Sequence, residues 1–233
     1  MPQITQLRPI AHIHSDFPSK FGVPRQSGLV EALSARIVFE PAFRNPDALR
    51  GLEGFSHIWL LWQFSGAHTQ GWSATVRPPR LGGNTRMGVF ATRSPFRPNP
   101  IGLSSVRLAG IEPRTPIGPV LHVLGADLMD GTPILDIKPY LAYTDSHPDA
   151  SCGFSAQPGE GLLEVTFPPA LLRRVPREKR EGLLCALAQD PRPGYQDQPD
   201  RRYKMAFGGF DVCFSVEEGR LTVWDVIPLR AEK

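Results

Sequence analysis

Apolar and polar residues alternate along several short stretches in the first two thirds of the chain, a pattern typical of half-buried β-strands. Residues 55–64 (FSHIWLLWQF) are the most apolar of these stretches, which predicts a buried central strand. Strands separated by turns, without long helices between them, predict an antiparallel β-barrel or sandwich. The expected strands cover residues 4–15, 29–39, 55–64, 87–92, 102–111, 120–128 and 132–137.

The pattern changes after residue 140. Residues 142–161 form a polar linker, and we place a domain boundary near Ser151. Residues 176–189 have an apolar stripe at helical spacing and a proline in the first turn, so they predict a helix. Residues 203–216 and 220–227 predict a hairpin. We therefore expect a mainly β protein, with an antiparallel β-barrel domain over residues 1–150 and a smaller α+β domain over residues 151–233.

Composition agrees with short strands and many turns. Glycine (22) and proline (25) together exceed a fifth of the 233 residues, and the apolar fraction of 41% is sufficient for a real core. The net charge is only +3. However, residues 54–111 contain six arginines and neither an acidic residue nor a lysine. This asymmetry predicts a positive face suited to nucleic acid or another polyanion.

Five of these arginines lie in residues 77–104, a stretch dense in proline and glycine. Pro95, Pro98 and Pro100 fix their φ angles and lack backbone donors, which predicts a stiff, extended or turning loop. A rigid loop that fixes guanidinium groups in space is suited to binding. The alternative is a solvated surface loop with ordinary arginines.

Several classes of function lack their sequence signals. The three cysteines lie far apart without CxxC spacing, which argues against a disulfide framework or a zinc site. No dinucleotide fingerprint or P-loop is present, which argues against an oxidoreductase or a P-loop NTPase. The sequence shows neither a signal peptide nor an apolar run of about 18 residues. We therefore expect a cytoplasmic protein that does not bind membranes.

Two histidines were considered as metal ligands. His12 and His14 alternate with Ile13 and therefore share one face of the first expected strand. This spacing is compatible with a metal, but no third ligand is visible. We therefore expect solvent-facing or capping histidines and no metal site.

Four stretches of the chain resemble a known family: VPRQSGLV, RGLEGFSHIWLLW, VRPPRLGGNTRMGVFATRSPFRPNPIGLS and DGTPILDIKPYL. They look like the TsaA-like, or TrmO, family of S-adenosylmethionine-dependent tRNA methyltransferases. The later AQDPRPGY resembles the motif of its two-domain bacterial members. The resemblance implies a homodimeric β-barrel enzyme that methylates N6 of threonylcarbamoyladenosine, next to the anticodon of threonine tRNAs.

The resemblance also implies a set of cofactor-binding residues. One departure concerns Ser65 and Gly66, which stand where relatives have a histidine and a polar residue. Contacts made there by backbone atoms would survive, whereas an imidazole contact would be lost or replaced. The positions carried over for S-adenosyl-L-methionine are Pro24, Arg25, Gln26, Ser65, Gly66, Arg93, Leu103, Asp130, Gly131, Thr132 and Pro133.

Methyl transfer to a nitrogen requires a proton acceptor. Our candidates are Asp136, Asp190 and Tyr195, although the alternation in TPILDI could also turn Asp136 toward solvent. Asp130, at a turn, is more simply a structural or cofactor-binding carboxylate.

Guanidinium groups are also suited to the phosphates of tRNA. For each candidate, the alternative is a surface position or a partner within the chain. The candidates for tRNA binding are Arg86, Arg97, Arg192 and Arg201.

Two other functions remain open. A methyltransferase of the same fold could act on a small molecule or another RNA, although the AQDPRPGY segment disfavours this. A non-enzymatic RNA-binding barrel would need only the basic face, and it predicts no cofactor binding.

Overall fold

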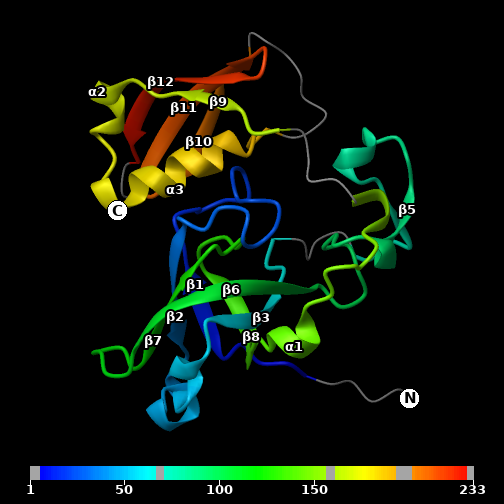
Figure 1. The fold of residues 1–233 in the computed structure, drawn as a ribbon, viewed down its shortest axis with the longest axis vertical. Coiled ribbons are helices and arrows are strands. Elements are labelled where there is room, and N and C mark those ends of the chain that lie inside the picture. The colour runs from blue at the N-terminus through cyan, green and yellow to red at the C-terminus, as the bar shows by residue number, and fades with distance from the viewer. Residues whose placement is uncertain (1–5, 67–70, 156–160, 193–200, 230–233) are drawn as a thin grey trace.

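The computed structural model describes residues 6–66, 71–155, 161–192 and 201–229. Figure 1 shows two units, a barrel built from the N-terminal half and a sheet with one longer helix built from the C-terminal part. No helix within the described ranges is long and apolar enough to cross a bilayer.

The first unit is a closed barrel of six strands in the order β1-β2-β7-β6-β3-β8. Every neighbouring pair is antiparallel, which confirms the predicted barrel. Ile13, Ile58 and Leu60 are fully buried in its core. The strands are β1 (Ala11–His14), β2 (Ser34–Phe39), β3 (His57–Gln63), β6 (Ile101–Glu112), β7 (Val120–Leu124) and β8 (Thr132–Pro139).

Short elements connect these strands. β4 (Thr75–Val76) and β5 (Met87–Gly88) pair with each other in a separate ribbon. The 3-10 helix η2 (Pro46–Leu49) begins after Asn45, whose side chain accepts the N–H of Asp47. The other short helices are η1 (Pro41–Phe43), η3 (Leu52–Gly54), η4 (Pro79–Leu81), η5 (Val89–Ala91), α1 (Ala142–Asp145) and η6 (Gly153–Ser155).

The second unit is a four-stranded sheet in the order β10-β11-β12-β9, with β9 parallel to β12. Helix α3 (Arg177–Ala188) lies on the side of this sheet that faces the barrel (Figure 1). Its residues Leu183, Ala186 and Leu187 are buried against the sheet. The remaining elements are β9 (Glu164–Thr166), α2 (Pro169–Leu172), β10 (Tyr203–Phe207), β11 (Phe210–Glu217) and β12 (Arg220–Pro228).

Two of the predicted strands are wrong in part. Residues 87–92 form only the two-residue strand β5 and then a 3-10 turn, because the backbone folds back at Val89. Residues 203–216 are two strands rather than one, because Gly208 and Gly209 both adopt positive φ and make a tight turn. The first two predicted strands are shorter than expected, beginning at Ala11 and Ser34.

Beside the core of the barrel, a second apolar cluster is shared between the two units. Phe17, Val30 and Leu33 belong to the N-terminal half, yet they are buried in the same cluster as α3 and the second sheet. Helix α3 approaches so closely that a Cβ on Gly182 would lie 3.1 Å from the carbonyl oxygen of Ala32. The second unit is therefore packed firmly against the loops that connect β1 and β2.

Candidate active site

The loop that carries Pro24, Arg25 and Gln26 lies on the connection between β7 and β8. The N–H of Gly28 donates to the carbonyl of Gly125 at 2.9 Å. Gly125 has a φ of +75°, and a Cβ there would lie 3.4 Å from the Cα of Gly28. The positive φ angles, +79° at Gly28 and +75° at Gly125, favour glycine at both positions, and the hydrogen bond brings the two connections together.

The turn at residues 130–133 is fixed to the end of β1. One carboxylate oxygen of Asp130 lies 3.2 Å from both Nδ1 of His14 and the backbone nitrogen of Ser15. The backbone N–H of Gly131, which has a φ of +74°, donates to the carbonyl of Ile13 at 2.8 Å. His14 is exposed, as the sequence predicts, and its ring also has a carboxylate partner.

Thr132 and Pro133 continue this turn into β8. The hydroxyl of Thr132 is buried and donates to the carbonyl of Met129 at 2.8 Å. Pro133 is half-buried and pairs with His12 of β1. Nδ1 of His12 itself lies 2.8 Å from a carboxylate oxygen of Glu40. The two histidines thus have separate carboxylate partners.

The arginine-rich loop joins the same group of segments. Nη1 of Arg93 donates to Oε1 of Gln26. The amide of Gln26 in turn donates to the carbonyl of Arg25 at 2.5 Å. Gln26 therefore links the loop that follows β5 to the loop that precedes β2.

Ser65, Gly66 and Leu103 lie at the edge of this group. A Cβ on Gly66 would be 4.0 Å from the terminal methyl of Met129, next to Asp130. Leu103 of β6 pairs with Leu61 of β3 and is 54% exposed, so it offers an apolar side chain outside the barrel.

Asp127 is a site residue that the sequence reasoning missed. Its Oδ1 accepts the hydroxyl of Ser104 at 2.6 Å, and the indole N–H of Trp62 donates to that same hydroxyl at 3.0 Å. Burial raises the pKa of the Asp127 carboxyl, while Ser104 and Arg93 act in the opposite direction. The available signal was a single acidic residue within the apolar stretch VLHVLGADL.

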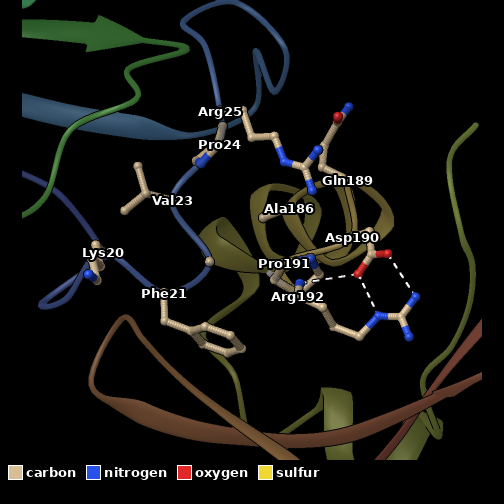
Figure 2. Close-up of a pocket in the computed structure, with 11 residues that line it drawn as sticks. Lys20, Phe21, Val23, Pro24, Arg25, Ala186, Gln189, Asp190, Pro191 and Arg192 are labelled. Carbon is tan, nitrogen blue, oxygen red and sulfur yellow. Dashed lines mark hydrogen bonds and ion pairs between the residues drawn. The ribbon is translucent and has the colours of Figure 1, made fainter. Parts of the chain in front are cut away.

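A cavity of about 320 Å³ separates the loop at residues 20–25 from the end of α3. Figure 2 shows Arg25 extending toward this helix end, with Asp190 and Arg192 on the opposite side. The guanidinium of Arg192 donates to both carboxylate oxygens of Asp190 at 2.9 Å. Asp190 has a φ of +51°, which turns the chain sharply after α3.

The three candidate proton acceptors have different surroundings. The carboxylate of Asp136 is half-exposed and lies 2.9 Å from the ammonium of Lys138. In the barrel, Asp136 of β8 pairs with Leu61 of β3. Asp190 lines the cavity but shares its carboxylate with Arg192. Tyr195 lies outside the described residues. Of the two candidates within the described residues, Asp190 lines the cavity together with Arg25.

The arginines predicted to bind tRNA all have partners within the chain. Arg97 donates to the carbonyls of Thr92 and Ser94 at 3.3 and 3.4 Å, so it braces its own loop. Arg86 lies 3.5 Å from the hydroxyl of Thr75, and Arg201 lies over the ring of Tyr203. Arg192 pairs with Asp190, as described above.

Comparisons with known proteins agree with this arrangement. The protein-family model for the tRNA-methyltransferase O N-terminal domain matches residues 12–146. The family model for the TrmO C-terminal domain matches residues 160–229. A tRNA (adenine(37)-N6)-methyltransferase of Escherichia coli is 41% identical over 96% of this chain and 98% of its own. A putative S-adenosylmethionine-dependent methyltransferase of Pseudomonas aeruginosa is 43% identical over 88% of this chain and 89% of its own.

Solved structures show the same relationship. A crystal structure of TrmO from Pseudomonas aeruginosa has a TM-score of 0.80 and 36% identity, and covers 98% of this chain and 99% of its own. The matches extend over both units and over the loops that meet around Asp130. The chain belongs to the TrmO family of tRNA methyltransferases.

Proposed function

We propose that this protein transfers a methyl group from S-adenosyl-L-methionine to N6 of an adenosine in tRNA. The observation that supports it is the convergence of the polar loops. Gln26, Arg93 and the turn at Asp130 come from three distant parts of the sequence, yet direct contacts hold their loops at one end of the barrel. Next to these loops, Arg25 lines the cavity that also holds Asp190 and Arg192.

The chemistry of these side chains fits the proposed cofactor. S-adenosyl-L-methionine carries a sulfonium, an ammonium and a carboxylate, and it supplies the methyl group from its sulfonium. The carboxylate of Asp130 can bind the cationic groups of the cofactor, and the guanidinium of Arg25 or Arg93 can bind its carboxylate. Leu103 offers an exposed apolar surface. The described residues contain no group of three metal-ligating side chains, and the proposed reaction requires none.

The protein's own work is to position the reactants and to accept a proton. Methyl transfer forms an N–CH₃ bond as an S–CH₃ bond breaks, and the nitrogen loses its proton. Asp190 is the candidate acceptor nearest the cavity, and Arg192 holds its carboxylate in a fixed orientation. Asp136 and Tyr195 remain alternatives.

We further propose the substrate and the setting. The acceptor would be threonylcarbamoyladenosine beside the anticodon of threonine tRNAs, in agreement with the name of the E. coli relative, which specifies adenine 37. An anticodon loop has unpaired bases that can enter a cavity of this size. Arg86, Arg97 and Arg201 would contact phosphates. The enzyme would act as a homodimer in the cytoplasm.

Methyl incorporation from labelled S-adenosyl-L-methionine tests this proposal. We expect label in threonine tRNA that carries the threonylcarbamoyl group and none in the same tRNA without it, with the product located by nucleoside mass spectrometry. Incorporation into both tRNAs would contradict the proposed substrate. Cofactor binding without incorporation into tRNA would favour another acceptor, and absence of cofactor binding would favour a non-enzymatic RNA-binding barrel.

A further inference from the structure

We propose that Asp127 is a positioning residue whose ionised carboxylate holds three cofactor-binding segments together, so that cofactor affinity depends on its ionisation. The inference rests on the function proposed above and extends it to a residue outside the set implied by the family resemblance.

The first segment is β6. Trp62 can only donate through its indole nitrogen, and it donates to the hydroxyl oxygen of Ser104. The hydroxyl proton of Ser104 is therefore directed to Asp127, 2.6 Å away. Ser104 is only 1% exposed and directly follows Leu103. The carboxylate thus ends a hydrogen-bond chain that fixes the strand carrying Leu103.

The other two segments contact the same carboxyl group. The loop before β2 is tied to the connection that carries Asp127, since the N–H of Gly28 donates to the carbonyl of Gly125 at 2.9 Å. The backbone of Ser27 and the positive charge of Arg93 both act to lower the pKa of the Asp127 carboxyl. Both interactions favour the ionised form. Since Arg93 also donates to Gln26, the three residues connect the loop before β2 with the arginine-rich loop. Asp127 itself lies three residues before Asp130.

This arrangement has a cost in stability. Burial is the dominant influence on Asp127 and raises the pKa of its carboxyl despite the three favourable partners. An ionised carboxylate at this position therefore opposes folding at neutral pH. The cost that burial imposes on this charge is accounted for by a role in binding.

The surrounding charges define a suitable control for pH effects. Arg93 is the charged residue that acts on Asp127 among the described residues. Asp130 and His14, on the neighbouring turn, pair with each other. Both residues are present in the wild type and in an Asp127 variant. A difference between the two proteins in how cofactor affinity changes with pH therefore reports on Asp127.

The test is calorimetric binding of S-adenosyl-L-methionine to the full chain from pH 8 down to the ordinary pKa of aspartate, about 3.9, because burial places the pKa of the Asp127 carboxyl above that value. Asp127→Asn keeps the shape of the side chain and removes its charge. We expect about tenfold weaker binding at pH 8, the scale of losing hydrogen bonds to a charged group. The difference should shrink as pH falls, because the wild-type carboxylate becomes protonated. The matched control is Asp225→Asn on β12, which removes an ion pair with Arg174. We expect this variant to bind the cofactor with the affinity of the wild type.

Two further measurements separate positioning from a merely structural role. Thermal unfolding at pH 8 should give Asp127→Asn a melting temperature equal to or above that of the wild type. Ser104→Ala removes a donor that favours the ionised form, so its affinity should decline at a higher pH than that of the wild type.

Equal affinity of Asp127→Asn and the wild type, or a ratio that stays constant with pH, would overturn the inference. A lower melting temperature of Asp127→Asn would also overturn it. Failure of the wild type and Asp225→Asn to bind the cofactor would instead reject the proposed function, and the inference with it.

Discussion

At the scale of single residues, the turn at Asp130 gives a direct test of the cofactor site. One oxygen of its carboxylate is shared between His14 and the N–H of Ser15. The other oxygen has no partner among the residues that the structure describes, and it is therefore available to a ligand. We expect Asp130→Ala to weaken S-adenosyl-L-methionine binding about tenfold, as for other charge-assisted contacts. Calorimetry measures the affinity, and Asp47→Ala, on the remote η2 helix, is the control.

Arg25→Ala tests the same site from the cavity side. The guanidinium of Arg25 extends toward the end of α3 (Figure 2), so its removal should reduce affinity for the cofactor or the tRNA without affecting the melting temperature. Unchanged cofactor affinity in both the Arg25 and the Asp130 variants would contradict the assignment of the site.

Asp145 provides a pH-dependent contribution to stability away from the site. Its Oδ2 accepts the N–H of Leu141 at 2.9 Å and the indole N–H of Trp59 at 2.8 Å. These bonds lower the pKa of the Asp145 carboxyl, the Leu141 backbone having the larger effect. The ionised form is therefore stabilised in the fold. This contribution is present above the ordinary pKa of aspartate, about 3.9, and is lost as pH falls through the lower folded value.

We accordingly expect Asp145→Asn to lower the melting temperature at pH 7, with a gap that closes as pH falls below the ordinary pKa of aspartate, about 3.9. Thermal unfolding followed by circular dichroism measures the gap, and Asp149→Asn, at an exposed neighbouring position, should match the wild type throughout. A gap that does not change with pH would mean that the Asn side chain disturbs packing rather than charge.

At the scale of elements, the arginine-rich loop behaves differently from a simple positive patch. Arg97 donates to two carbonyls of its own loop, so it holds the loop shape as well as carrying charge. Arg97→Glu should weaken tRNA binding and reduce its salt slope by about one. Arg97→Lys keeps the charge and should therefore retain the slope.

Filter binding of tRNA at several salt concentrations measures both slopes. A slope equal to the wild type in Arg97→Glu would show that Arg97 acts only within the loop.

The elements also show where sequence patterns were sufficient. Strand β6 and helix α3 match their predicted ranges closely, because alternation over ten residues and an apolar stripe over three turns are strong signals. Residues 87–92 have too few positions to show a period, and tertiary contacts decide their path. The turn at Gly208 and Gly209 was missed because apolar residues continue on both sides of it.

The site was predictable only in part. Motif resemblance identified Gln26, Arg93 and Asp130, whose loops do meet in the fold. The contact between Ser104 and Asp127 joins residues 23 positions apart, one on β6 and the other after β7. No local period reports such a contact, so it could be found only from the folded chain.

At the scale of the whole molecule, the shared core makes the two units dependent on each other. Leu33 is 5% exposed and is buried among residues of the second unit. Leu33→Ala should therefore destabilise the whole protein by about 2–5 kcal/mol, the usual cost of removing a buried leucine side chain. Chemical denaturation measures this change as one cooperative transition, and Leu7→Ala, at a 58% exposed position, should have little effect. Separate transitions for the two units would contradict the shared core.

The cavity takes one wall from residues 20–25 and the other from residues 186–192. A ribosome that adds about 5–20 residues per second needs roughly 8 to 30 seconds to travel between them. By the end of that interval the barrel strands have been made, whereas the second wall of the cavity is only then being synthesised. A nascent chain is therefore without a complete site until its last helix emerges, and a prematurely released chain leaves a barrel whose cavity stays open on one side.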